Sequence, residues 1–357
     1  MKRIAIIGLG VIGASLGMAL QSAQPDLEVL GTDIYPVTVE KAMEMAAISR
    51  PLLNEDISTC EVVFIATPLR IIPQVLMQIW DGLSPGTIVS DVGSVKSWVM
   101  KQYEKYLPPG VSGIGGHPLA GSDRRGITGA DKYLLQNAVY VLTPLASTAD
   151  DKLASLKDLL AETGAQMVIL TPTEHDQMVS KVSHLPHIVA ASLMNNLEQH
   201  QGALRLAAGG LRDTTRIAAS NPELWEDILL FNGVSVAEEI SALIFQLNRY
   251  RQAIESNDGT SLCQYLANAQ RMRENMPLSR SSLEHSADIV AIIPDKPGII
   301  GVLGTFLGEE GININDIQIM GVRDENEGSI RIGVPQSQVQ VALQLLKDNG
   351  IRAWIRD

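Results

Sequence analysis

Cysteine is scarce in this chain, which contains two cysteines among 357 residues. Cys60 and Cys263 lie far apart and match no spacing that is typical of a zinc site or a disulfide framework. The sequence therefore predicts free thiols in a reducing compartment and no metal centre.

Basic residues are also in deficit, with 28 Lys and Arg against 40 Asp and Glu and a net charge of −12. This negative charge disfavours nucleic acid and anionic membrane surfaces as partners, although it leaves room for local basic pockets. No apolar run approaches the roughly 18 residues that a membrane helix needs, and the N-terminal "MKRIAIIG" is too short for a signal-peptide core. We therefore expect a cytoplasmic protein with no membrane or nucleic-acid partner.

The chain divides into three stretches of different character. Over residues 1–170, short apolar runs such as "RIAIIG" and "VVFIAT" alternate with helical patterns, which is typical of an α/β domain with a mostly parallel sheet. Residues 171–280 carry helical patterns alone, and their long apolar helices predict an all-α domain that packs against a second copy of the chain. Residues 286–357 follow the order βαββαβ, which predicts a small split-βαβ domain.

The segment "GLGVIG" follows the first predicted strand and begins a helical pattern, as in a Rossmann-type dinucleotide-binding domain. Its first glycine permits a tight turn, its second lets a pyrophosphate approach the backbone, and its third permits close packing of helix on strand. Asp33 ends the second strand, where a carboxylate would hold ribose hydroxyls and repel a 2′-phosphate, so NAD is predicted rather than NADP. The turn after the third strand either contacts the cofactor ribose or is a plain turn. The predicted cofactor contacts are Gly8, Leu9, Gly10, Val11, Ile12, Gly13, Asp33, Thr67 and Pro68.

Two later loops carry candidate catalytic residues. Ser94 lies in "DVGSVK" after the fourth predicted strand, and His117 lies in "GGHPLAGSD" after the fifth. Strand ends of this kind meet at the sheet edge that binds the cofactor, where a neutral imidazole can accept the proton of an alcohol as its hydride leaves. His117 is therefore a candidate base, although a loop histidine can also simply face water. Ser94 could cap the next helix, bind a substrate hydroxyl or His117, or do both.

The helical stretch contains "SHLPH", which places His184 and His187 three residues apart on one helix face, with Pro186 predicting a kink or a restart. Three interpretations of this pair stay open: a structural pair, a pair that lines a cleft, and a pair of metal ligands. The sequence favours the metal ligands least. Further along, Asp213 and Arg216 either form an exposed ion pair, or Arg216 grips a substrate carboxylate with its guanidinium group.

Taken together, these motifs resemble those of prephenate dehydrogenases that carry a C-terminal ACT domain. The likeness spans nearly the whole chain and includes "IIPDKPGIIGVL" near the C-terminus. It implies NAD-dependent oxidative decarboxylation of prephenate to 4-hydroxyphenylpyruvate and CO2 by a homodimer, with tyrosine as a feedback effector. The alternatives are an arogenate dehydrogenase, another hydroxyacid dehydrogenase, or a non-enzymatic sensor of NAD and an amino acid.

The resemblance also implies residue roles. His117 takes the proton of the ring hydroxyl, and Ser94 bridges that hydroxyl, His117 and the nicotinamide. Asp123, where relatives often have Glu, and Asp176 match an acidic gate, while Asp213 and Trp225 match the pocket entrance and the side of the dimer partner. The implied substrate contacts are Arg216, His187, Ser183, His184, Asp213, Trp225, Asp123 and Asp176. In the ACT-like domain the implied tyrosine contacts are Asp295, Gly298, Asn313 and Ile314, unless that domain serves only for assembly.

Overall fold

The structure of the protein is a computed structural model that describes residues 2–121, 124, 126–276, 286–324 and 327–356. It contains two compact units, Met1–Asp258 and Gly259–Asp357, which are described here one at a time.

The first unit is built on an eight-stranded sheet with the order β3-β2-β1-β4-β5-β6-β7-β8. Its strands are parallel except where β6 meets β7. The strand order changes direction between β1 and β4, and in open α/β sheets the ligand crevice lies at such a point, outside the carboxyl ends of the strands. The strands are β1 (Arg3–Ile7), β2 (Glu28–Thr32), β3 (Arg50–Pro51), β4 (Val62–Ile65), β5 (Ile88–Asp91), β6 (Ser112–Pro118), β7 (Val139–Pro144) and β8 (Gln166–Ile169).

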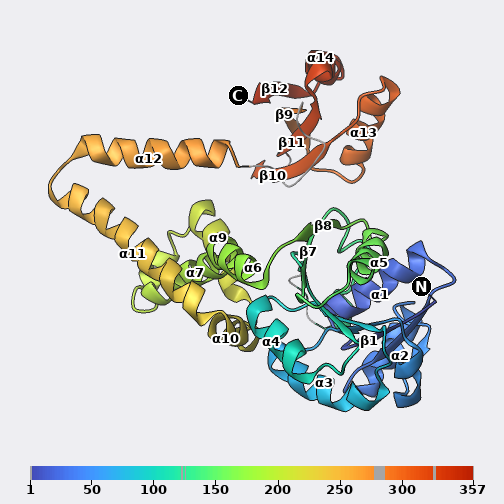
Figure 1. The fold of residues 1–357 in the computed structure, drawn as a ribbon. Coiled ribbons are helices and arrows are strands. Elements are labelled where there is room, and N and C mark those ends of the chain that lie inside the picture. Colours follow the sequence, from blue (N-terminus) through green and yellow to red (C-terminus); the bar gives the residue numbers. More distant parts are fainter. Residues whose placement is uncertain (1, 122–123, 125, 277–285, 325–326, 357) are drawn as a thin grey trace. The chain divides into compact units, whose positions relative to one another are not determined.

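Helices cover both faces of this sheet (Figure 1). Strand β4, "VVFI", is buried over its whole length, as expected of a parallel strand with helices on either side. Phe64 points into the core cluster on one face, whereas Ile65 points into the cluster on the other. The helices of this part are α1 (Val11–Ala23), α2 (Pro36–Glu44), α3 (Ile72–Ile79), α4 (Lys96–Tyr106) and α5 (Asp150–Ala161), with short 3-10 turns η1 (Asn54–Thr59), η2 (Leu69–Ile71), η3 (Trp80–Gly82) and η4 (Ile127–Gly129).

The rest of the first unit is helical, as the sequence predicts. Its first helix begins at a capping box in which Thr171 Oγ1 accepts a hydrogen bond from the Glu174 amide at 3.2 Å. Its elements are α6 (Pro172–Val179), η5 (Ser180–His184), α7 (Leu185–Asn196), α8 (Gln201–Leu204), α9 (Gly209–Thr215), η6 (Arg216–Ala219), α10 (Pro222–Phe231) and α11 (Gly233–Glu255).

The predicted irregularity at Pro186 takes the form of a π-helical turn. Segment η5 is π-helical, and the amide of Leu185 donates to the carbonyl of Ser180, five residues back. Pro186 has no N–H to continue the ordinary ladder. His184 ends this turn and His187 lies on the helix that follows, and both histidines are buried.

The second unit has helix α12 (Gly259–Glu274) followed by an antiparallel sheet with the order β10-β11-β9-β12. The predicted βαββαβ order is present, and one apolar cluster lies between its sheet and its helices. Its elements are β9 (Ser286–Pro294), α13 (Ile299–Glu309), β10 (Asp316–Asp324), β11 (Glu327–Pro335), η7 (Gln336–Gln338), α14 (Val339–Asp348) and β12 (Arg352–Arg356).

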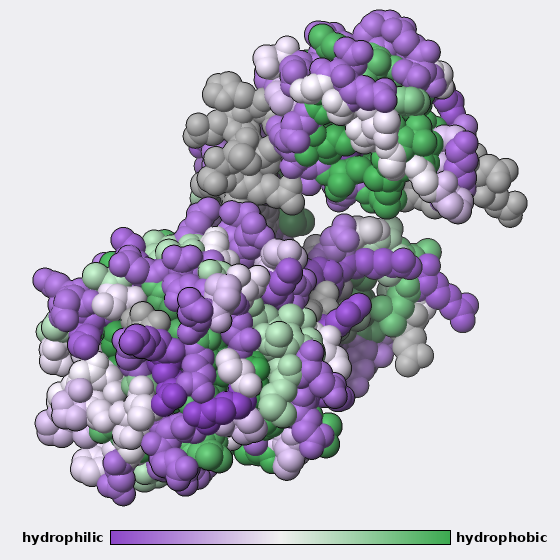
Figure 2. Space-filling view, turned by 90° about the vertical axis from the view of Figure 1, so that its right-hand side faces the viewer, coloured by the Kyte–Doolittle hydropathy of each residue, from purple (hydrophilic) through white to green (hydrophobic). Residues whose placement is uncertain are grey.

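Within the described residues, no single helix is long and apolar enough to cross a membrane. Helices α10 and α11 pass the length and composition test only as a pair, and they are bent by 93°. Polar residues cover much of the face of the first unit that Figure 2 presents, with apolar residues scattered between them.

Candidate active site

The glycine loop lies at the carboxyl end of β1, beside the change in strand direction. Gly8 has a φ of +99°, and a Cβ there would lie 2.5 Å from the carbonyl oxygen of Ala66. At Gly13 a Cβ would collide with the carbonyl of Gly8, whereas at Gly10 it would meet no heavy atom within 4 Å. The loop is therefore tightly packed on one side and open at Gly10, where α1 begins and its free N–H groups can bind an anion.

Two further groups at this crevice fit a dinucleotide. The Asp33 carboxylate accepts hydrogen bonds from the Leu9 amide at 2.9 Å and from the Tyr35 amide at 3.1 Å, so it lies directly beside the glycine loop. The hydroxyl of Thr67 is buried and has no hydrogen-bond partner among the described residues. Pro68, next to it, is exposed, while Val11 and Ile12 are half-buried at the start of α1. The open Gly10 and the carboxylate beside it match what the pyrophosphate and the adenosine ribose of a dinucleotide require.

His117 lies at the end of β6 and is 8% exposed. Its Nδ1 is 2.7 Å from Nε2 of His175, and Nδ1 of His175 is 2.8 Å from Oδ1 of Asp176. The three side chains form a chain of hydrogen bonds from a buried carboxylate to a histidine at the sheet edge. The sequence patterns did not single out His175 as a site residue. The one signal for it was its position directly before Asp176, just after the capping box of Thr171 and Glu174.

Asp176 also anchors helix α4. Its Oδ1 accepts from the Lys96 amide at 2.7 Å and its Oδ2 from the Ser97 amide at 2.8 Å, so a side chain from α6 caps the N-terminus of α4. This position corrects the predicted place of Asp176 at an acidic gate, because the residue is 3% exposed and both of its oxygens are engaged.

The same contacts bear on Ser94. The structure corrects the idea that Ser94 caps α4, since Asp176 fills that role. Ser94 is half-buried and makes no hydrogen bond within the described ranges, which leaves its hydroxyl available to a ligand.

Burial and the neighbouring charges determine the protonation states of His117, His175 and Asp176, which together form a hydrogen-bonded relay. Burial lowers the pKa of His117 well below its usual value, and His175, Lys96 and His184 lower it further. Burial likewise lowers the pKa of His175, which outweighs the opposing hydrogen bond to Asp176. Burial raises the pKa of Asp176, but hydrogen bonds from His175 and from the start of α4 outweigh this and lower it.

The proton positions follow from these states. An ionised Asp176 can only accept, so His175 donates from Nδ1 and is left with a lone pair on Nε2. His117 must then donate from its own Nδ1, which leaves a lone pair on its Nε2. That atom can act as a general base.

A buried ion pair supports the strand that carries His117. The Lys96 ammonium pairs with the Asp91 carboxylate, and it also donates to the Gly116 carbonyl at 2.6 Å. Asp91 accepts from the Gly116 amide at 3.2 Å. Asp91 and Lys96 are both fully buried, and they hold the backbone just before His117.

The helical part of the first unit, from α6 to α11, contributes a wall to the candidate site. The Trp225 ring stacks on His187 of the same chain, with ring centroids 3.6 Å apart and planes 5° apart. Asn232 donates to the Asp176 carbonyl at 2.9 Å and to Nδ1 of His184 at 3.1 Å. Burial lowers the pKa of His184 to about 4 and also lowers that of His187. His184 is therefore tied into the structure, whereas the buried Nδ1 of His187 has no partner among the described residues.

The remaining predicted substrate residues lie around this wall at varying exposure. Ser183 is half-buried on the π-helical turn, while Asp213 and Arg216 are exposed on α9 and η6. Segment η6 packs against α7, the helix that carries His187. Asp123 lies outside the described residues. The described part of the chain holds no group of three His, Cys, Asp or Glu that could bind a metal ion.

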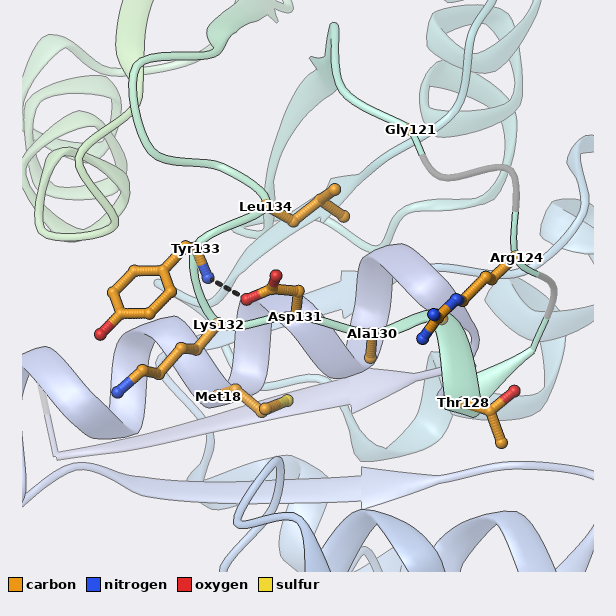
Figure 3. A pocket seen from close by; sticks show the side chains of 10 residues that line it. Met18, Gly121, Arg124, Thr128, Ala130, Asp131, Lys132, Tyr133 and Leu134 are labelled. Carbon is orange, nitrogen blue, oxygen red and sulfur yellow. Dashed lines mark hydrogen bonds between the residues drawn. The ribbon is translucent and has the colours of Figure 1, made fainter. Parts of the chain in front are cut away.

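A separate pocket of about 590 Å³ lies beside α1 (Figure 3). Met18 of α1 lines one side, and the segment that follows β6 lines the other, where the Tyr133 amide donates to Asp131 at 2.9 Å. Among the described residues, none of those that we predicted as catalytic or substrate-binding lines this pocket.

The four predicted effector residues belong to the second unit. Asp295 and Gly298 lie in the loop before α13, and Gly298 has a φ of +87° at the helix N-cap. The Asn313 amide donates to Asn315 at 2.9 Å, and Ile314 packs against the apolar cluster of this unit.

Comparison with known proteins gives consistent results. A family model described as the prephenate dehydrogenase nucleotide-binding domain matches residues 16–169, and one described as the prephenate dehydrogenase dimerization domain matches residues 171–268. The prephenate dehydrogenase of Bacillus subtilis strain 168 is 34% identical over 340 residues, which cover 92% of this chain and 91% of that protein.

Two solved structures show the same likeness. The prephenate dehydrogenase from A. aeolicus, in complex with hydroxyphenyl propionate and NAD+, matches with a TM-score of 0.72 and 28% identity, over 78% of this chain and 99% of that one. The Synechocystis arogenate dehydrogenase matches with a TM-score of 0.69 and 31% identity, over 77% of this chain and 100% of that one.

Proposed function

Because this chain belongs to the prephenate dehydrogenase family, we propose that it catalyses the NAD-dependent oxidative decarboxylation of prephenate to 4-hydroxyphenylpyruvate and CO2, a step toward tyrosine. The observation that carries the proposal is the relay from Asp176 through His175 to His117. It leaves a basic nitrogen at the sheet edge that also holds the glycine loop. We also propose that the protein is located in the cytoplasm.

The chemistry suits these side chains. Bound NAD would supply the acceptor for the hydride that leaves the ring carbon bearing the hydroxyl. Nε2 of His117 accepts the hydroxyl proton, which leaves a ketone conjugated with the carbon that carries the ring carboxylate. Loss of CO2 then makes the ring aromatic, and His117 returns its proton to the same oxygen to give a phenol. Aromatisation drives the loss of CO2, so this step needs no metal.

Substrate binding is assigned to the wall of the helical half. Ser94 would hydrogen-bond the ring hydroxyl, because its own hydroxyl is not used to cap α4. Arg216 would bind a substrate carboxylate bidentately. The unpaired Nδ1 of His187 would hydrogen-bond the side chain of prephenate.

Arogenate is the second candidate substrate. The likeness to the Synechocystis arogenate dehydrogenase favours it, and the reaction differs only in an amino group in place of a keto group. NADH formation with each compound decides between them. A kcat/KM for prephenate at least tenfold above that for arogenate supports the proposal, and the reverse order assigns the protein to arogenate.

Assembly as a homodimer is part of the proposal. The dimerization-domain model matches the helical half, and α11 exposes Ile244, Phe245, Leu247 and Ile254. Light scattering after gel filtration tests this, and a mass of one chain at micromolar concentration contradicts it.

We assign residues 286–357 of the second unit to the ACT type, with tyrosine as the ligand. The βαββαβ order and the left-handed Gly298 at the start of α13 support this assignment. Turnover with and without tyrosine is the test. Inhibition by tyrosine that Asn313→Ala weakens would support the site. If tyrosine neither binds measurably nor affects turnover, the assignment fails and assembly is the role that is left for this domain.

A further inference from the structure

Arg70 joins the nucleotide-binding half of the first unit to α10. It lies on η2, two residues after Pro68, and its Nε donates to Oδ1 of Asp227 at 2.6 Å. Its Nη2 lies 2.5 Å from the same oxygen and 3.0 Å from Oε2 of Glu226. Asp227 is 4% exposed, whereas Glu226 is well exposed. The bond to Asp227 is therefore the sheltered one, and the bond to Glu226 faces water.

Helix α10 packs against the rest of the first unit on both sides of Asp227. Two residues before it, Trp225 stacks flat on His187. Just after it, Ile228 packs in the apolar cluster of the nucleotide-binding half, and Phe231 stacks on Trp98 of α4 at 4.2 Å. The position of this helix thus determines where the wall of His187 and Trp225 lies.

Arg70 is equally close in sequence to the cofactor crevice. The backbone just before it, at Ala66 and Thr67, is the backbone that a Cβ at Gly8 would strike. The turn that precedes Arg70 therefore packs directly on the glycine loop. One short segment contacts the cofactor loop at one end and holds α10 at the other.

We propose that Arg70 is a positioning residue for substrate: through Asp227 it holds α10, and with it the Trp225–His187 wall, at the working distance from the cofactor crevice. The proposal rests on the assigned prephenate dehydrogenase activity for its kinetic readout. Two nitrogens of the planar guanidinium, Nε and Nη2, converge on one oxygen of Asp227, a contact that the single nitrogen of an ammonium group cannot reproduce.

Loss of this grip is expected to weaken substrate binding more than chemistry. The relay of His117 is held by α4 and α6 and does not use Arg70. We therefore expect Arg70→Ala to raise the KM for prephenate about tenfold, with kcat changed less than threefold and NAD binding unchanged, because the lost interaction serves the bound substrate and the transition state alike.

Three variants separate positioning from general damage. Arg70→Ala leaves the Asp227 carboxylate buried without its partner, which destabilises the fold. Arg70→Ala combined with Asp227→Asn removes that charge, so it should recover thermal stability while KM stays raised. Arg70→Lys keeps the charge without the fork and should give an intermediate KM.

Two controls are available in the same unit. Glu226→Gln removes only the water-exposed partner and should leave KM unchanged. Arg50→Ala removes a comparable guanidinium network, to Glu28 and Asp56, that does not touch α10. It should lower the melting temperature and leave the KM for prephenate as it is.

The deciding experiment measures prephenate kinetics and, by calorimetry, the binding of hydroxyphenyl propionate to the NAD-loaded full chain. A KM raised about tenfold and an affinity weakened about tenfold in Arg70→Ala and in the double variant, with a smaller change in Arg70→Lys and none in either control, supports the proposal. An unchanged KM and affinity in the folded double variant, or an equal loss in Arg50→Ala, overturns it. If the wild type shows no turnover, the proposed activity fails, and the binding measurement still judges Arg70.

Discussion

The Nδ1 atom of His117 lies 2.7 Å from Nε2 of His175, and this contact decides which nitrogen of His117 is free to act as a base. The charge of Asp176, passed on through His175, keeps the proton of His117 on the inner nitrogen. The other nitrogen, Nε2, then carries the lone pair. The roles resemble those of a carboxylate that orients a catalytic histidine through one hydrogen bond, with a second imidazole placed between them.

Replacing His175 tests this relay. Gln in its place can still accept from Nδ1 of His117 through its amide oxygen, whereas Phe has no acceptor and fills a similar volume. We expect His175→Phe to lower kcat about a hundredfold, within the range that general-base catalysis contributes, and His175→Gln to lower it clearly less. Steady-state NADH formation measures both. Equal kcat values for the two variants and the wild type would rule out the orienting role.

Stability should fall on mild acidification. His117, His175, His184 and His187 are buried, and burial lowers the pKa of each in the folded state. As the pH falls below about 6.5, the unfolded chain binds protons that the folded chain does not. The free energy of unfolding then decreases by about 1.4 kcal/mol per pH unit for each such histidine, and the decrease ends only below the folded pKa values.

Urea unfolding between pH 7.5 and 4.5 checks this sign. His117→Asn removes one of the four groups and should give a shallower decline than the wild type. A free energy of unfolding that stays flat or rises over this pH range would contradict the neutral, buried state of the histidines.

Asp33 is expected to select NAD over NADP. Asp33→Asn keeps an oxygen that can accept from the Leu9 amide but removes the charge that repels a 2′-phosphate. We expect the preference for NAD, measured as the ratio of kcat/KM values, to drop at least tenfold. Asp33→Ala should show the same drop with an additional loss of NAD affinity, because the glycine loop loses its hydrogen bond. An unaltered ratio in both variants would assign cofactor choice elsewhere.

Arg216 is expected to bind a carboxylate of the substrate. Arg216→Ala should raise the KM for prephenate about tenfold or more, since a charge-assisted bidentate pair is lost, and leave the KM for NAD unchanged. Arg212→Ala is the matched control, because this residue carries the same charge one helical turn earlier and is also exposed. A rise confined to the KM for NAD, or an equal effect of the two variants, would argue against the assignment.

Much of the architecture follows from local patterns in the sequence. The alternation of strands and helices and the break at Pro186 predict elements that the structure contains. Strand β3 escaped prediction because its two residues, Arg50 and Pro51, carry no apolar pattern. The order of strands also placed Ser94 and His117 at the cofactor edge of the sheet.

The contacts that turn these residues into a site depend on long-range packing, which local patterns do not encode. His175 is separated from His117 by 58 residues, and Arg70 from Asp227 by 157. The sequence shows that Asp176 is an acid, but it does not show that α4 begins beside this residue. The predicted position of Asp176 at an acidic gate therefore differs from its buried position at the start of α4. For the same reason, the sequence did not indicate that Asn232 supports His184 through a hydrogen bond.

The central claim is that His117 acts as the base in the oxidation of prephenate by NAD. The most direct measurement follows NADH and 4-hydroxyphenylpyruvate in the wild type and in His117→Asn, with NAD affinity measured in parallel. We predict equal amounts of both products from the wild type, and in the variant a kcat lower by about 10²- to 10⁴-fold with unchanged NAD affinity. An unchanged kcat in His117→Asn, or a wild type that forms no NADH from prephenate, would contradict the claim.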